Sequence, residues 1–171
     1  MVKYIILDLD LTVVCTLSDC NCDNHHEILV TNGKFGENPI YVHLRPFAKE
    51  FIKREQNKDN KFVIFSANDP EYVHLVSDIV FSNLNPPIAI LTEEDLIEDH
   101  LIGYFVKTLE TVSNKISVPI QHLIAIDDNL FMYPRDEQVI SIPPWSLLSD
   151  LSTERNDVYQ DTFFKHLEIS N

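Results

Sequence analysis

The chain has 171 residues, of which 44% are hydrophobic and 10% aromatic, so it can bury a core and is not a disordered segment. Its 27 acidic and 13 basic side chains give a net charge of −14, which argues against broad binding to nucleic acids or to anionic membranes. The sequence has no run of about 18 apolar residues and no apolar signal-peptide core, so we expect no transmembrane helix and an intracellular location, nuclear or cytoplasmic.

The first predicted element is a strand that ends in two aspartates. Residues 2–7 form a short, mostly apolar run, which is typical of a strand buried on both faces of a parallel sheet. Asp8 and Asp10 follow it, and they point the same way because side chains alternate along an extended backbone. Two carboxylates on one face repel each other unless a divalent cation or bound chemistry stabilises them. This strand end therefore predicts a metal-assisted reaction.

A small insertion is expected after this strand. Residues 15–26 are polar and turn-rich, which indicates a loop. Residues 27–31 and 39–44 are β-like runs on either side of Asn32-Gly33, and this pattern predicts a hairpin with a wide turn. We therefore expect a single domain over residues 1–171 that contains a small β insertion at about residues 15–45.

The rest of the chain alternates between strands and helices. The expected elements are a helix from Arg45-Pro46, a strand at 61–66, a helix with apolar positions from Tyr72 to Val80, a strand at 88–91 followed by a Thr92/Asp95 capping box, an apolar run at 104–106, strands at 123–126 and 139–142, and helical packing from Trp145 to Ile169. Such alternation predicts a three-layer α/β domain with a central parallel sheet and helices on both faces.

Polar residues follow three of these strands. They are Asp8 and Asp10, Ser66 and Asn68, and Asp127 and Asp128, and Lys107 lies between the second and third pairs. The carboxyl ends of parallel strands meet at one edge of the sheet, so these side chains are expected in one crevice. One carboxylate can attack phosphorus, a second can transfer protons, and a lysine and a hydroxyl can neutralise phosphoryl oxygens. Carboxylates are also ligands of Mg²⁺.

The motifs resemble those of a known enzyme family. Asp8-Leu9-Asp10-Leu11-Thr12 is similar to the Asp-x-Asp-x-Thr signature of haloacid-dehalogenase-superfamily phosphatases. Four further motifs narrow the resemblance: Leu44-Arg45-Pro46, Phe65-Ser66-Ala67, the segment 103–109 with Lys107, and Ile126-Asp127-Asp128. Together they resemble the small phosphatases that act on the C-terminal domain of RNA polymerase II, also called the NLI-interacting-factor-like family.

This resemblance implies a role for each matching residue. Asp8 would be the nucleophile and a metal ligand, and Asp10 the general acid/base with its backbone carbonyl on the metal. Thr12 would support the loop, Ser66 and Ala67 would bind the phosphoryl group, and Lys107 would neutralise it and hold Asp8. Asp128 would be a Mg²⁺ ligand, and Asp127 would orient metal-bound water. The chain departs from the pattern at Cys15 and Thr108, where many members have His and Asp.

The predicted function is that of a Mg²⁺-dependent phosphoserine or phosphothreonine protein phosphatase that forms an aspartyl-phosphate. The resemblance implies the RNA polymerase II C-terminal domain, or a similar phosphopeptide, as substrate. One alternative is a phosphatase of nucleotides or nucleic-acid ends, since the same catalytic core serves those substrates. Another is a non-catalytic module that binds phosphoprotein.

Two features have alternative interpretations. Ser66 and Asn68 are also candidate helix N-caps before Pro70. Cysteines and histidines in one short segment are candidate zinc ligands, namely Cys15, Cys20, Cys22, His25 and His26. Their spacing matches no common zinc motif, so an exposed insertion loop is the default prediction for this segment.

Overall fold

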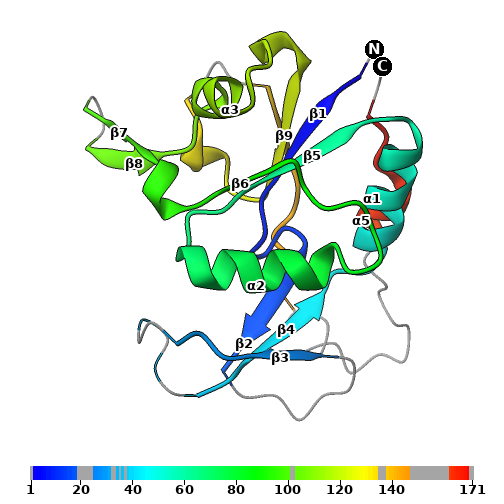
Figure 1. The fold of residues 1–171 in the computed structure, drawn as a ribbon, viewed down its shortest axis with the longest axis vertical. Helices are drawn as coiled ribbons and strands as arrows, with labels where there is room; N and C mark the ends of the chain where they lie inside the picture. Colours follow the sequence, from blue (N-terminus) through cyan, green and yellow to red (C-terminus); the bar gives the residue numbers. More distant parts are fainter. Residues whose placement is uncertain are drawn as a thin grey trace.

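A computed structural model describes residues 2–18, 25–31, 34, 36, 38–100, 103–134, 138–146 and 162–169. A parallel sheet lies at the centre of this part of the chain (Figure 1). Its strands, in spatial order, are β10 (Val139–Ser141), β9 (Leu123–Asp127), β1 (Tyr4–Leu7), β5 (Lys61–Phe65) and β6 (Ala89–Leu91). The first strand of the chain is therefore the middle strand of the sheet, and both of its neighbours run parallel to it.

Both faces of the sheet are apolar because its strands carry apolar residues at successive positions. Ile5 and Leu7 belong to the core against α1 (Ala48–Asn57), α2 (Pro70–Val80) and α5 (Phe163–His166). Ile6 belongs to the core on the other face, against α3 (Leu109–Ile116). Since side chains alternate along a strand, one short run can fill both cores, and the three-layer α/β prediction is confirmed.

Two smaller antiparallel sheets accompany the central one. β2 (Val14–Leu17), β4 (Ile40–Leu44) and β3 (His26–Ile28) form the first, and β7 (Ile97–Asp99) pairs with β8 (Tyr104–Val106) in the second. Figure 1 shows them apart, with the β7–β8 hairpin beside β6 and the three-stranded sheet below α2. Short 3₁₀ helices lie at Glu93–Asp95 (η1), Ile120–His122 (η2) and Leu130–Met132 (η3).

Helices α2 and α3 begin after residues that are suited to N-capping. The Asp69 carboxylate accepts hydrogen bonds from the amides of Glu71 and Tyr72 at the start of α2, and Pro70 occupies the first turn. Thr108 caps α3 in the same way. The predicted capping box of Thr92 and Asp95 is confirmed at η1. Within the described residues, no helix is long and apolar enough to cross a membrane.

Several local predictions need correction. The segment 15–17 is part of strand β2 rather than a loop, because its residues pair with β4. The N-cap of α2 is Asp69, and neither of the two candidate caps, Ser66 and Asn68, occupies that position. Pro46 lies before α1, which starts after Phe47 in the left-handed conformation. The predicted hairpin is present as β3 and β4, although its turn residues Asn32 and Gly33 lie outside the described part of the chain.

A buried hydroxyl in α2 gives a stability prediction. Among the residues that the structure describes, the Ser77 side chain is buried and its oxygen has no hydrogen-bond partner. Ser77→Ala removes that unsatisfied group and raises helix propensity, so we expect it to increase the free energy of unfolding by about 1 kcal/mol. Denaturant unfolding followed by circular dichroism measures this change.

Ser113 in α3 is the matched control. Its hydroxyl donates a 2.7 Å hydrogen bond to the Val118 carbonyl, so Ser113→Ala gains the same propensity but loses a bond. We expect no stabilisation from Ser113→Ala. Equal effects of the two substitutions would contradict the assignment of Ser77 as an unsatisfied group.

Candidate active site

The carboxyl ends of β1, β5 and β9 border one crevice, as the topology predicts. Its lining residues are Asp8, Asp10, Leu11, Ser66, Ala67, Asn68, Lys107, Asp127, Asp128, Asn129 and Met132. The crevice thus brings together side chains from four separate parts of the sequence. Every site residue expected from the sequence lines this crevice except Thr12, which is buried and contacts the lining residue Asp128.

A buried lysine joins two of the strand ends. The Lys107 ammonium donates to Asp8 Oδ1 at 2.6 Å and to Asp127 Oδ2 at 2.7 Å, and the residue is only 2% exposed. Burial alone would lower the pKa of Lys107, but the charges of Asp8 and Asp127 outweigh this effect and raise the pKa. The ammonium is therefore a permanent positive charge against the Asp8 carboxylate.

Three carboxylates form a cluster that could hold a cation. Oxygens of Asp8, Asp127 and Asp128 lie within 4.8 Å of one another. Burial, followed by the charge of Asp8, raises the pKa of Asp128 and raises the pKa of Asp127 to about 6. An all-oxygen donor set of this kind suits a hard divalent cation, which would also relieve the repulsion among the carboxylates.

Thr12 fixes the position of Asp128. Its hydroxyl donates to Asp128 Oδ1 at 3.1 Å and accepts from the Asp128 amide at 3.1 Å. The Arg45 guanidinium in turn donates to the Thr12 carbonyl at 3.1 Å and lies over the rings of Phe163 and Phe164. Thr12 thus supports a member of the carboxylate cluster, and Arg45 supports Thr12, a role that the Leu44-Arg45-Pro46 motif alone does not indicate.

The turn after β1 has a strained residue in its middle. Leu11 has φ 59°, in the left-handed region that residues with a side chain rarely adopt. Its amide donates to the Val14 carbonyl at 2.8 Å, and its carbonyl accepts from the Trp145 amide at 2.7 Å. These bonds hold the turn that carries Asp10 on one side and Thr12 on the other.

Asp10 has a different environment from Asp8. The Tyr72 hydroxyl donates to Asp10 Oδ1, and the Asn68 amide donates to Oδ2 at 3.4 Å. Burial raises the pKa of Asp10, and although the hydrogen bond from Tyr72 opposes this, the net pKa is above the usual value. The sequence pattern predicts Tyr72 as one of the apolar positions of a helix. Its hydroxyl is the only feature in the sequence that could have indicated a hydrogen bond to Asp10.

Ser66 and Ala67 line the crevice beside these carboxylates. The Ser66 amide donates to the Leu91 carbonyl at 3.1 Å as part of the sheet. Since this amide is used within the sheet, a phosphate contact from Ser66 itself would come from its hydroxyl.

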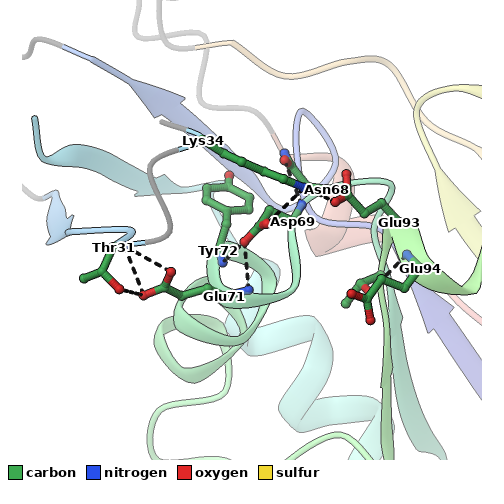
Figure 2. A network of polar contacts seen from close by, with 9 residues as sticks. Thr31, Lys34, Asn68, Asp69, Glu71, Tyr72, Glu93 and Glu94 are labelled. Atoms are coloured by element: carbon green, nitrogen blue, oxygen red, sulfur yellow. Dashed lines mark hydrogen bonds and ion pairs between the residues drawn. The ribbon is translucent and has the colours of Figure 1, made fainter. Parts of the chain in front are cut away.

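Polar contacts tie the insertion to the start of α2 (Figure 2). The Glu71 carboxylate accepts from the amide and the hydroxyl of Thr31. The Lys34 ammonium lies 3.2 Å from Asp69 Oδ2 and also pairs with Glu93. Figure 2 shows Lys34 reaching over Tyr72 toward both acids. The insertion is thereby anchored to the same helical turn that positions Asp10.

The zinc alternative has no support within the described residues. In that part of the chain, the only group of three or more potential ligands is the carboxylate cluster. Cys15 is buried opposite His43 in the β2–β4 pair, and the rings of His25 and His43 are 5.8 Å apart. Cys20 and Cys22 lie outside the described residues, so a zinc site that includes them stays untested.

A family model identifies the chain. The model of the NLI interacting factor-like phosphatases matches residues 3–168. The chain belongs to this family. The resemblance to the NLI-interacting-factor-like family of haloacid-dehalogenase-superfamily phosphatases is thereby confirmed. Membership of this family supports phosphoric monoester hydrolase activity.

Solved structures agree on the fold. The chain is similar to fission yeast Fcp1, an RNA polymerase II CTD phosphatase, in an R271A variant bound to beryllium fluoride, with 17% identity and a TM-score of 0.68. A second Fcp1 structure gives 16% identity and a TM-score of 0.68. Each match covers 85% of this chain and 42% of Fcp1, so the chain spans less than half of that protein. No curated protein sequence matches significantly.

The cluster predicts a pH-dependent response to divalent cations. Cations bind ionised carboxylates, and Asp127, with its pKa raised to about 6, is largely ionised at pH 7 and largely protonated at pH 5. Since protons compete with the cation, we expect millimolar Mg²⁺ to raise the melting temperature more at pH 7 than at pH 5. Thermal unfolding with Mg²⁺ and with chelator measures this difference.

Two variants test where the cation binds. Asp128→Ala removes a member of the cluster and should abolish the stabilisation by Mg²⁺. Asp78→Ala, which changes an exposed acid on α2, should keep it. An equal Mg²⁺ response at both pH values, or a full response in Asp128→Ala, would contradict the proposed cation site.

Proposed function

We propose that the protein is a Mg²⁺-dependent phosphatase of phosphoserine or phosphothreonine in proteins, acting through an aspartyl-phosphate on Asp8. The observation that carries this proposal is the ion pair between Lys107 and Asp8. The nearby carboxylate of Asp10 contacts the neutral Tyr72 hydroxyl instead of an ammonium. A carboxylate held by a buried ammonium is positioned for attack, and the same charge can neutralise the phosphoryl oxygens.

In the first step the Asp8 carboxylate attacks phosphorus. A bond forms between Asp8 oxygen and phosphorus, and the bond from phosphorus to the seryl or threonyl oxygen breaks. Protonated Asp10 gives its proton to that leaving oxygen. The raised pKa of Asp10 suits this role, because it keeps the acid form available at a higher pH than an ordinary aspartate would.

In the second step water attacks the phosphorus of the aspartyl-phosphate. Asp10, now ionised, takes a proton from the water, and the bond between phosphorus and Asp8 oxygen breaks. Phosphate leaves, and both aspartates return to their starting forms. The Ser66 hydroxyl and Lys107, which both line the crevice, would hold the phosphoryl oxygens during both steps.

The proposed cofactor is Mg²⁺, held by Asp8 and Asp128 and by the Asp10 backbone carbonyl, with Asp127 alongside. Mg²⁺ favours a few carboxylates together with waters and a substrate phosphate, and when bound it would neutralise phosphoryl charge. Thr12 keeps Asp128 in place for this role through its two hydrogen bonds.

The proposed substrate is the phosphorylated C-terminal domain of RNA polymerase II or a similar phosphopeptide. Support comes from family membership and from the fold shared with Fcp1, itself a phosphatase of that domain. An intracellular location is part of the same proposal.

Two alternative functions have less support. The negative charge of the chain opposes the hydrolysis of phosphates at polynucleotide ends, and the intact Asp8, Asp10 and Lys107 oppose a non-catalytic binding module.

Replacing the nucleophile tests the mechanism. Asp8→Asn replaces the attacking carboxylate with a neutral amide, which is a poor nucleophile of the same shape, so we expect kcat to fall by about 10³-fold or more. Phosphate release from a phosphopeptide and from a small aryl phosphate measures the loss, with Asp78→Asn as the control. Mg²⁺-dependent hydrolysis retained in Asp8→Asn would exclude Asp8 as nucleophile.

A pH profile tests the role of Asp10. The Tyr72 hydroxyl stabilises the ionised form of Asp10, so Tyr72→Phe should raise the pKa of Asp10 further. If Asp10 is the general acid, activity declines as the pH rises through this pKa, and the decline moves to higher pH in the variant. The measurement is kcat against pH with a substrate that has a poor leaving group. A decline that stays in place or moves to lower pH contradicts this assignment.

A further inference from the structure

Five large apolar side chains are exposed on two segments beside the crevice. Tyr104 and Phe105 in β8 are 72% and 61% exposed, and Phe131 in η3 is 92% exposed. Ile97 in β7 and Leu130 in η3 are about half exposed. Ile97 and Tyr104 share the face of the hairpin that carries the buried Val106, whereas Phe105 lies on the opposite face, so we call Phe105, Leu130 and Phe131 the apolar patch. Two separate segments, both rich in exposed aromatic and aliphatic groups, are more than the scattered apolar residues of an ordinary surface.

The patch is continuous with the proposed active site. β8 leads directly into Lys107, and the Lys107 amide donates to the Met132 carbonyl at 2.7 Å. Phe105 lies two residues before Lys107, and Phe131 lies one residue before Met132, which itself lines the crevice. β8 and η3 also lie against each other. The two segments of the patch therefore meet at the crevice wall that carries the lysine.

Phe105 lies on the exposed face of the hairpin. Residues paired directly across two strands share a face of the sheet, so Phe105 lies on the same face as the exposed Glu98, whereas the next residue, Val106, is buried. Gly103, with φ 71°, begins the return of the hairpin into β8. Figure 1 shows that the hairpin and the β2–β4–β3 sheet lie at different places around the central sheet. The patch and the insertion therefore border the site from different directions.

We propose that the apolar patch binds an apolar side chain of the phosphoprotein substrate, close in sequence to the phosphorylated residue. This inference rests on the proposed function. Phe105 lies about 7 Å along the strand from Lys107, a distance that an extended peptide covers in roughly two to four residues beyond its phosphate. A substrate held in the crevice must leave it past one of these walls, and this wall presents the exposed side chains of Phe105, Leu130 and Phe131.

An acid beside the patch defines the rest of the segment. Glu98 pairs with Phe105 across the hairpin, and its side chain is exposed. Its carboxylate favours a basic residue next to the apolar one and disfavours an acidic one. The proposed occupant is therefore a phosphopeptide segment that carries an apolar residue and a neighbouring basic residue close to the phosphate. A phosphopeptide with only polar residues at these positions should bind less well.

The test compares substrates that differ only in the anchor. A phosphoserine peptide with polar spacers is compared with peptides that carry Phe three residues before or three residues after the phosphoserine. We expect one Phe peptide to have a kcat/KM about tenfold higher than the spacer peptide, mainly through KM. In Phe105→Ser and Phe131→Ser this ratio should fall toward one. In Ile120→Ser, an exposed apolar residue before the amino end of β9, it should stay at the wild-type value.

Several outcomes overturn the inference. Equal hydrolysis of the three peptides by the wild-type protein, or a preference retained in both Phe variants, excludes the patch as a substrate site and leaves the proposed function standing. A dimer that dissociates in Phe131→Ser assigns the patch to a second copy of the chain. Failure to hydrolyse any peptide, with hydrolysis of an aryl phosphate intact, excludes a protein substrate and the patch inference with it.

Discussion

The Lys107 ammonium, buried between Asp8 and Asp127, is the interaction on which the site depends. These carboxylates come from the ends of two neighbouring strands, and each would be repelled by the other in a medium of low dielectric. A buried ammonium without partners would be equally unfavourable. The three charges stabilise one another only in this geometry. The position of β8 relative to β1 and β9 is therefore an electrostatic requirement as well as a result of packing.

This arrangement also gives Asp8 and Asp10 different environments. Both side chains leave the same strand end, but Asp8 contacts a permanent cation whereas Asp10 contacts the neutral Tyr72 hydroxyl and the Asn68 amide. Burial and the neighbouring Asp10 raise the pKa of the Tyr72 hydroxyl, so it remains a donor. Two aspartates with different environments can serve as nucleophile and acid in one reaction. The network around Lys34 connects that acid to the insertion, and hence to a surface that a macromolecular substrate would meet.

The sequence predicted the parts of the molecule that are encoded by short-range pattern. Apolar runs ending in polar residues identified β1, β5 and β9, and their parallel pairing follows from the topology of α/β sheets. β2 was missed because Cys15-Thr16-Leu17 lacks an apolar run and gains its order from pairing with β4. β7 was missed because two of its three residues are acidic. The Tyr72 contact with Asp10 joins residues 62 positions apart, which no local pattern encodes. The exposure of Phe105 was equally hidden, since exposed and buried apolar strands read alike.

Direct detection of the covalent intermediate tests the central claim, that Asp8 is the nucleophile held by Lys107. An Asp10→Asn variant lacks the base that activates water, so an aspartyl-phosphate formed from an activated aryl phosphate should accumulate in it. After acid quenching and digestion, mass spectrometry locates the phosphoryl group. We predict phosphate on Asp8, labile to hydroxylamine and absent from an Asp8→Asn/Asp10→Asn double variant. Phosphate on another residue, or its persistence in the double variant, would exclude Asp8 as the nucleophile.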